Sequence, residues 1–186
     1  MKFIKRTILA ILILTAVILL FRGWIYRNLI TYKSVGPAIN YRATDNKLIG
    51  YINANAGKQA NPNIEQIIKL ALVITSKQLN FTVEKNNSDP NKLIVTKTAH
   101  CVGYAAFFST TCNYLLNNYH LANTWTAKPQ VGQLYLFGQN IHKYFHSPFF
   151  KNHNFVTIEN KTTGKIYAVD PTVNDYLYID YVKYKH

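Results

Sequence analysis

An apolar run near the N-terminus is the feature that most constrains what this chain can fold into. The fifteen residues from Thr7 to Phe21 include no charged side chain, and basic residues flank them on both sides. A helix of this sequence is apolar on every face, whereas a helix on the surface of a soluble core has one polar face. We therefore predict that residues 1–30 form a membrane segment and that the rest of the chain folds separately.

Two interpretations of this segment are open on length alone. Fifteen helical residues rise about 22 Å, short of the roughly 30 Å hydrocarbon core, so a cleaved signal peptide is an alternative. No small-x-small cleavage signal follows Phe21, and Trp24 and Tyr26 suit the membrane interface, which favours an uncleaved anchor. The basic tip predicts a single-pass protein of the cell membrane, bacterial in type, whose domain is extracytoplasmic, either periplasmic or at the cell surface.

The remaining sequence predicts one α+β domain. Residues 31–60 are polar and contain Gly and Pro, which is typical of a linker or of a loosely structured entry into the domain, and residues 61–186 form the domain itself. Asn61 and Pro62 begin one helical stripe, and a second helical run extends from Cys101 to about Tyr119. Helices first and an antiparallel meander second are typical of this fold class. The predicted strands are residues 81–84, 133–138, 155–159, 165–169 and 176–182.

The charge of the chain is strongly positive. Outside the N-terminal segment, 16 Lys and Arg stand against 8 Asp and Glu, a net charge of +8. This excess suits an anionic polymer or lipid headgroups, although the lysines are scattered. The alternating Tyr and Ile near the C-terminus are explained by an edge strand, so no nucleic acid partner is expected.

Cys101 opens the second helical run. The free N–H groups and the positive dipole end of a helix N-terminus favour the thiolate, which is the nucleophilic form of cysteine. Cys112 lies eleven residues later, about 16 Å along the helix axis, whereas a disulfide needs Cα atoms within roughly 7 Å. We predict two free thiols, with Cys112 in the core and Cys101 as a candidate nucleophile.

A predicted hairpin supplies a base and a group to orient it. If Asn160 pairs with Thr163 across the turn, His153 faces Asp170 on the neighbouring strand. Directly opposed residues point to the same face with Cβ atoms roughly 5 Å apart, so the carboxylate can hold the imidazole in one tautomer. A slip of one residue would put the two side chains on opposite faces. In this register the chain has a thiol nucleophile (Cys101), a general base (His153) and an orienting carboxylate (Asp170).

Three segments together resemble the transglutaminase-like superfamily of papain-like cysteine enzymes. They are Cys101–Phe108 at a helix start, His153–Ile158 at a strand start, and Gly164–Thr172, which ends in Asp-Pro-Thr. The spacings between the three functional positions, 52 and 17 residues, also fit the family pattern. The resemblance implies a papain-like or transglutaminase-like core, in which the helix that carries the cysteine packs on an antiparallel sheet.

By this resemblance Cys101 attacks a carbonyl and forms a thioester, His153 moves the proton and Asp170 orients His153. The Cys101 N–H is then the first oxyanion donor. The expected reaction is peptide or amide hydrolysis, or acyl transfer to an amine, on a peptide or protein substrate and with no cofactor. Protein crosslinking is not implied, since Val102 stands where crosslinking enzymes have Trp and the chain is too short for their β-sandwich domains. A non-catalytic binding module on the same fold, holding an anionic polymer or lipid headgroups, is the alternative.

Other residues near the candidate site have two interpretations each. His100 and Tyr104 flank Cys101 and are candidate substrate-binding residues, although Tyr104 suits core packing equally well. The aromatic residues between 144 and 150 form either a cleft wall or part of the core. His142 and His146 are spaced like metal ligands on a helix, but no carboxylate or thiol lies near them in sequence, so no metal is expected.

Overall fold

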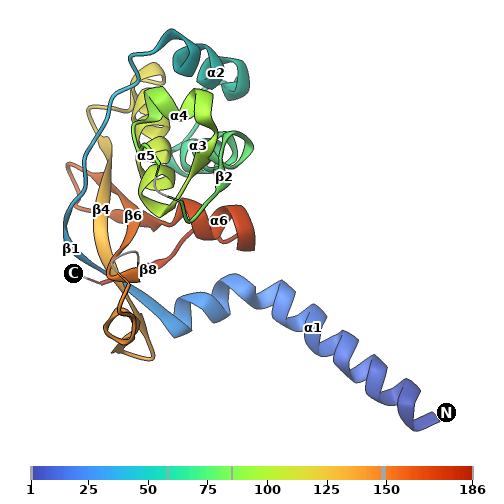
Figure 1. Ribbon diagram of the computed structural model, residues 1–186. Coiled ribbons are helices and arrows are strands. Elements are labelled where there is room, and N and C mark those ends of the chain that lie inside the picture. The colour runs from blue at the N-terminus through green and yellow to red at the C-terminus, as the bar shows by residue number, and fades with distance from the viewer. Residues whose placement is uncertain (1, 58, 85, 148–149, 186) are drawn as a thin grey trace.

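A long N-terminal helix leads into an α+β domain that contains a mixed sheet (Figure 1). The computed structural model describes residues 2–57, 59–84, 86–147 and 150–185. The helices are α1 (Lys2–Leu29), α2 (Asn46–Ala56), α3 (Ile64–Gln78), α4 (Pro90–Thr96), α5 (Cys101–Asn118) and α6 (Pro171–Leu177), with a short 3₁₀ helix, η1 (Ile141–Tyr144). The strands are β1 (Ile30–Pro37), β2 (Asn80–Phe81), β3 (Thr98–Ala99), β4 (Trp125–Leu136), β5 (Gln139–Asn140), β6 (His153–Asn160), β7 (Ile166–Val169) and β8 (Lys183–Tyr184).

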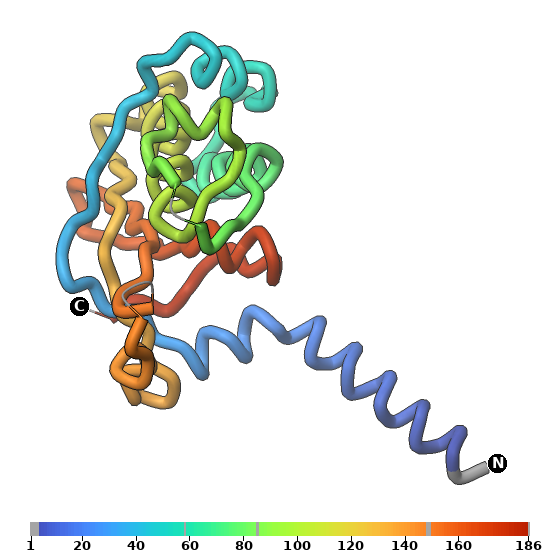
Figure 2. Tube along the Cα trace, viewed as in Figure 1, coloured from blue at the N-terminus to red at the C-terminus, as the bar shows by residue number. Residues whose placement is uncertain are grey.

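Helix α1 extends away from the domain and is exposed over most of its length (Figures 1 and 2). Its stretch Ile4–Leu29 has 26 residues and a mean hydropathy of 2.5, and its most apolar window is not buried in the protein. The helix is long and apolar enough to cross a membrane, a criterion that a signal sequence also meets. It continues past Arg22, so its 26 residues rise about 39 Å and exceed the roughly 30 Å hydrocarbon core.

The last turns of α1 contact the domain. The Arg22 guanidinium donates hydrogen bonds to the carbonyls of Leu177 (2.8 Å) and Tyr178 (3.5 Å), at the end of α6. One turn further along α1, the hydroxyl oxygens of Tyr26 and Tyr32 lie 2.6 Å apart. An apolar pocket of about 560 Å³ lies between α1 and the C-terminal end of α6. The helix is therefore held against the domain at this end, and β1 follows it without a loop.

Residues 31–60 were predicted as a linker or a loosely structured domain entry, and in the structure they form the regular elements β1 and α2. Strand β1 lies inside the sheet, between β4 and β8, and α2 buries Leu48 and Ile52 in the core. The Gly and Pro residues that suggested a linker mark the ends of these elements. Gly36 and Pro37 end β1, and Gly57 follows α2 with a φ of 65°, a conformation that glycine adopts without strain.

Both long helices of the domain lie close to their predicted positions. Helix α5 begins at Cys101, as predicted, and ends one residue before Tyr119. Helix α3 begins slightly later than predicted, because Asn63 rather than Asn61 is its N-cap. The Asn63 side chain accepts from the Gln66 N–H while the Gln66 side chain accepts from the Asn63 N–H, which satisfies two of the free donors at the helix start.

The sheet has the strand order β7-β6-β4-β1-β8, and β5 also pairs with β4. The pairs β7–β6 and β6–β4 are antiparallel, as predicted, and β4 also pairs antiparallel with β1, which was not a predicted strand. Strand β8, however, runs parallel to β1, so the sheet is mixed rather than antiparallel throughout. Figure 1 shows helices α2 to α6 gathered on one side of this sheet.

The strands predicted between residues 133 and 169 correspond to strands of the sheet, whereas the strand predicted nearest the C-terminus of the chain is wrong. Residues 155–159 and 165–169 correspond to β6 and β7, and residues 133–138 overlap the second half of β4. Residues 81–84 retain only the end of the short strand β2. Residues 176–182 are not a strand, because Asp170 caps α6 and Pro171 occupies its first position, so a helix continues to Leu177.

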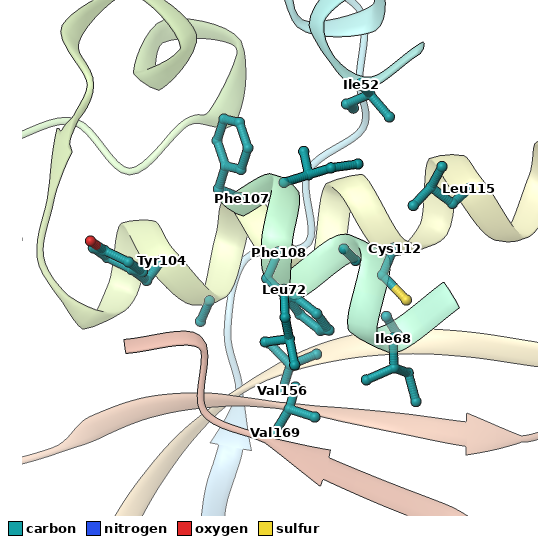
Figure 3. Packing of buried hydrophobic residues seen from close by; sticks show 14 of the residues in the cluster. Ile52, Ile68, Leu72, Tyr104, Phe107, Phe108, Cys112, Leu115, Val156 and Val169 are labelled. Carbon is teal, nitrogen blue, oxygen red and sulfur yellow. The ribbon is translucent and has the colours of Figure 1, made fainter. Parts of the chain in front are cut away.

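The main core lies between α3, α5 and the sheet. Phe108 of α5 and Leu72 of α3 point toward Val156 of β6 and Val169 of β7 (Figure 3). Cys112 belongs to the same cluster and is fully buried. Both cysteines are free thiols, as predicted. This packing fixes α5, and with it Cys101, over the end of the sheet where His153 begins β6.

Candidate active site

Cys101 is the first residue of α5. His100 is the N-cap of that helix, and its Nδ1 accepts a hydrogen bond from the Val102 N–H (3.3 Å). Capping by His100 satisfies one free donor of the first turn and leaves the dipole of an eighteen-residue helix directed at the thiol. The thiol is partly buried and also receives a hydrogen bond from the backbone N–H of Asn154 in β6.

The hairpin that carries His153 and Asp170 has a different register from the predicted one. Val156 pairs with Val169, whereas the prediction paired it with Tyr167. The pairing is thus displaced by two residues. Because side chains alternate between faces, a displacement of two preserves the face of every residue. His153 and Asp170 therefore still point to the same side of the sheet, and Asp170 lies diagonally across from His153 rather than directly opposite.

The turn chemistry explains this displacement. Asn160 Oδ1 accepts hydrogen bonds from the N–H groups of Thr162 and Thr163, both 2.9 Å. Gly164 has a φ of 71°, and the Asn160 N–H donates to the Lys165 carbonyl (2.8 Å). Asn160 thus closes a turn of four residues, where the prediction had a turn of two.

Consecutive hydrogen bonds connect the side chains of Cys101, His153 and Asp170 in one continuous path. His153 Nε2 donates to Asp170 Oδ2 at 2.5 Å, which leaves Nδ1 as the ring nitrogen for the hydrogen bond with the Cys101 sulfur. Asp170 has no exposed surface, and the His153 side chain is 20% exposed. The carboxylate is held further by its Oδ1, which accepts from the N–H groups of Thr172 (3.0 Å) and Val173 (3.2 Å) as the N-cap of α6.

The electrostatics of this path favour a charged pair. Burial alone would raise the pKa of Cys101, but hydrogen bonds from His100 and His153 and the charge of His153 lower it from 9.0 to about 6. Burial would lower the pKa of His153, but the charge of Asp170 and the hydrogen bond to it raise it from 6.5 to about 10. Between about pH 6 and pH 10 the pair is therefore a thiolate and an imidazolium.

The charge of Asp170 is maintained despite its burial. Desolvation would raise the pKa of Asp170, but the positive charge of His153 and hydrogen bonds from His153, Tyr32 and the Val173 N–H hold it below 3.8. The buried Cys112 shows the opposite behaviour, because burial without such partners raises the pKa of its thiol to about 12. Of the two cysteines, Cys101 is therefore the one whose surroundings favour the thiolate.

Tyr32 is a member of the site that sequence reasoning missed. Its hydroxyl donates to Asp170 Oδ2 at 2.7 Å, and its ring meets the His153 ring edge to face with centroids 6.0 Å apart. Tyr32 lies in β1, within the segment predicted to be a linker or domain entry, and 138 residues from Asp170 in sequence. Once that segment is assigned to the sheet, the alternation along β1 directs Tyr32 to the face of the sheet that Phe155 occupies.

A pocket of about 250 Å³ borders Cys101 and His153. Its wall is mostly apolar, and no Lys, Arg, Asp or Glu lines it among the described residues. Phe145 and Phe150 contribute to it, so the aromatic segment between 144 and 150 supplies cleft wall; Phe149 lies outside the described residues. The further apolar lining residues are Phe81, Leu134 and Ile141.

The two predicted substrate-binding residues have other positions. Tyr104 is fully buried, and its hydroxyl donates to Asp175 Oδ2 (2.7 Å) and lies 3.0 Å from the Leu79 carbonyl oxygen, so it packs in the core rather than lining the pocket. His100 caps α5 and contacts the thiol, and it is not part of the pocket wall.

The predicted helical spacing of His142 and His146 does not form. His142 is in η1, which ends at Tyr144, and its Nδ1 donates to the Phe150 carbonyl at 2.6 Å. His146 is exposed beyond η1. Among the described residues, no group of three His, Cys, Asp or Glu side chains is placed to hold a metal ion.

Comparison of the chain with protein-family models, with curated proteins and with solved structures finds no match. We therefore interpret the site from the chemistry of its own residues.

Proposed function

We propose that the chain is a membrane-anchored cysteine enzyme with a transglutaminase-like, papain-like core that transfers an acyl group through a thioester on Cys101. The observation that carries the proposal is the continuous path from the Cys101 sulfur through His153 to Asp170, next to a pocket. The order of these residues along the chain and the Asp-Pro that ends β7 support the family resemblance. We place the domain outside the cytoplasm on a single α1 span, in keeping with the basic N-terminal tip.

The charged pair defines the chemical steps. The thiolate attacks the carbonyl carbon of the substrate, so a C–S bond forms and the carbonyl oxygen gains the negative charge. When the carbonyl reforms, the bond to the leaving amine breaks, and the imidazolium of His153 gives that amine its proton. A water or an amine then attacks the thioester, neutral His153 takes its proton, and the C–S bond breaks to restore the thiolate. Asp170 stays ionised and stabilises the imidazolium at each stage.

The pocket beside Cys101 indicates which acyl group is used. Phe81, Leu134 and Phe150 present apolar surface, and apart from the Cys101–His153 pair no charged side chain lines the pocket among the described residues. A volume of about 250 Å³ suits one large apolar side chain next to the scissile carbonyl. We infer that the acyl donor is a peptide or amide with an apolar residue at the cleaved position.

The test is capture of the acyl-enzyme. A panel of activated peptide esters with apolar, acidic or basic residues at the acyl position is incubated with the full-length protein, and the mass added to Cys101 is measured. We expect acylation by the apolar members, none in Cys101→Ala, and unchanged acylation in Cys112→Ala. Absence of any adduct on Cys101 would contradict an acyl-transfer function, and equal use of acidic members would contradict the apolar pocket.

A binding module is the second candidate, and a basic pocket favours it. Lys33, Lys183 and Lys185 line a polar pocket of about 480 Å³ where β1 and β8 meet. Such a pocket can hold the phosphates of an anionic polymer. If binding of polyphosphate weakens with salt, is lost when these three lysines become Gln and persists in Cys101→Ala, while Cys101 forms no acyl adduct, the binding module is the better description.

A further inference from the structure

We propose that Tyr32 is a positioning residue of the Cys101 site and that Tyr26, in the last turn of α1, acts through it. The membrane-spanning helix is then part of the active-site scaffold as well as an anchor. The proposal rests on the proposed function only in taking Cys101 as the reactive group. Its basis is a chain of four consecutive hydrogen bonds, from Tyr26 through Tyr32, Asp170 and His153 to Cys101.

Which group donates in each of these hydrogen bonds follows from the number of protons that the two hydroxyls carry. Asp170 is ionised and can only accept, so the single O–H proton of Tyr32 is donated to Asp170 Oδ2 at 2.7 Å. Tyr32 therefore has no proton left for Tyr26. The hydroxyl of Tyr26 must donate to the oxygen of Tyr32, at 2.6 Å. Each bond polarises the next, so Tyr26 makes Tyr32 a better donor to the carboxylate.

The position of Tyr32 is fixed by packing. The residue has no exposed surface, and its ring contacts Phe155 edge to face with centroids 5.3 Å apart, as well as the ring of His153. The Tyr32 hydroxyl and His153 Nε2 bind the same oxygen of Asp170. Tyr32 thus determines where that oxygen lies, and through it the orientation of the imidazole that faces Cys101.

Loss of the Tyr32 hydroxyl has a defined direction of effect. A buried carboxylate that loses one charge-assisted hydrogen bond is less stable as the anion. Without the Tyr32 hydroxyl, Asp170 Oδ2 is also no longer held in line with His153 Nε2, so the hydrogen bond between them weakens. The His153 imidazolium is then stabilised less, and it stabilises the Cys101 thiolate less. The pKa of Cys101 must rise. A residue with only a structural role would lower stability without moving this pKa.

The experiment measures the pH dependence of Cys101 alkylation in the full-length protein, kept in detergent micelles. Second-order rate constants for iodoacetamide are determined from pH 4 to pH 10, with mass spectrometry to assign the adduct to Cys101. In Tyr32→Phe we expect the inflection to rise by about one pH unit, which is about a tenfold slower reaction below pH 6. Tyr26→Phe is expected to give a smaller shift in the same direction. The double variant should match Tyr32→Phe, because Tyr26 acts only through Tyr32.

Tyr181→Phe is the matched control. The Tyr181 hydroxyl is buried and has no hydrogen-bond partner among the described residues, so its removal deletes the same atom outside the site. We expect an unchanged inflection. An unchanged inflection in Tyr32→Phe, or additive shifts in the double variant, would overturn the proposal, as would a wild-type inflection near that of an ordinary thiol. Alkylation needs no substrate, so these outcomes are independent of whether an acyl-enzyme is captured.

Discussion

At the scale of the residue, the Asp170 carboxylate is the most heavily bonded group of the site. Its Oδ2 accepts from His153 and Tyr32, and its Oδ1 accepts from two N–H groups in the first turn of α6. These donors offset the desolvation of a side chain with no exposed surface, so the group stays charged. That fixed charge makes His153 basic, and protonated His153 makes Cys101 acidic.

Replacing His153 by Ala tests the charged pair. Without the imidazolium, the alkylation inflection of Cys101 should rise from about 6 toward the ordinary value of 9.0. For the full change the thiolate fraction at pH 7 falls about 90-fold, and the iodoacetamide rate constant at that pH should fall with it. If the inflection stays near its wild-type value, the helix dipole and His100, rather than His153, acidify the thiol.

Asp170→Asn separates the charge of this residue from its role as a helix cap. Asn caps a helix as well as Asp does, so α6 should keep its first turn. The pKa of His153 should fall from about 10, because its attraction to the carboxylate is lost. A pH titration of the His153 ring signal by NMR measures the change. Asp170→Ala should give a similar fall and also lower the free energy of unfolding by about 1 kcal/mol, since it removes the cap.

The same carboxylate makes stability depend on pH in the acid range. The folded-state pKa of Asp170 lies below 3.8, so its charge stabilises the fold fully above about that pH, and this contribution is lost as the pH falls through the lowered pKa. Urea unfolding at a series of pH values should therefore show a smaller acid-side loss of stability in Asp170→Asn than in the wild type. An identical pH dependence in both proteins would contradict the lowered pKa.

Residue types, their order and the family resemblance together singled out Cys101, His153 and Asp170 as candidates, and the structure brings their side chains together. These signals were not enough for Tyr32 and Tyr104. Nothing in spacing distinguishes a tyrosine whose partner is 138 residues away. Tyr104 was placed near the pocket by its distance of three residues from Cys101, but Asp175 of α6 holds its hydroxyl in the core.

At the scale of the element, local signals predicted the long helices α3 and α5 well, missed the shorter helices α2, α4 and α6, and predicted the strand register poorly. The face of His153 and Asp170 was right although the register was displaced by two residues, because faces depend only on whether the displacement is even or odd. The error came from the turn, where Asn160 and Gly164 favour a longer loop. Asp170 and Pro171 form both a strand end and a helix start, and only the first was predicted from sequence.

Gly132→Ala tests how closely the strands support the site. Gly132 in β4 pairs with His153, and an added Cβ would overlap the ring of Phe155 and lie 3.0 Å from the Lys33 carbonyl oxygen. We expect a loss of about 1–3 kcal/mol in the free energy of unfolding, measured by urea titration. Gly50→Ala in α2 is the control, because no atom lies within 4 Å of its added Cβ. A Gly132→Ala protein as stable as the control would mean that Phe155 can move aside.

At the scale of the whole molecule, an apolar helix and a basic domain share one short chain. The class α+β and the N-terminal helix were predictable, since each rests on patterns longer than ten residues. The packing of the helix end on the domain was not, because Arg22 and Tyr26 find their partners at Tyr178 and Tyr32, far away in sequence or in a segment taken for a linker.

The membrane role of α1 can be tested with two charges. In the double variant Ile11→Lys with Leu14→Lys, each lysine at the helix centre costs roughly 2.5–3.5 kcal/mol in the bilayer. The wild-type chain should stay with the membrane fraction after carbonate extraction and keep its full mass, and the variant should be released. Release of the wild-type chain, with a mass shorter by the N-terminal segment, would show that α1 is a cleaved signal peptide.

The direct junction of α1 and β1 sets how far the domain can travel. A flexible linker of thirty residues, the length from residue 31 to 60, has a root-mean-square end-to-end distance of about 30 Å, so a domain attached through it could move that far from its attachment point. Here Leu29 ends the helix and Ile30 already pairs with Leu136 in the sheet, so no flexible residue separates α1 from the domain. If α1 crosses a membrane as proposed, the height of Cys101 above the bilayer is therefore a fixed dimension of the molecule, and a substrate must come to that height to be reached.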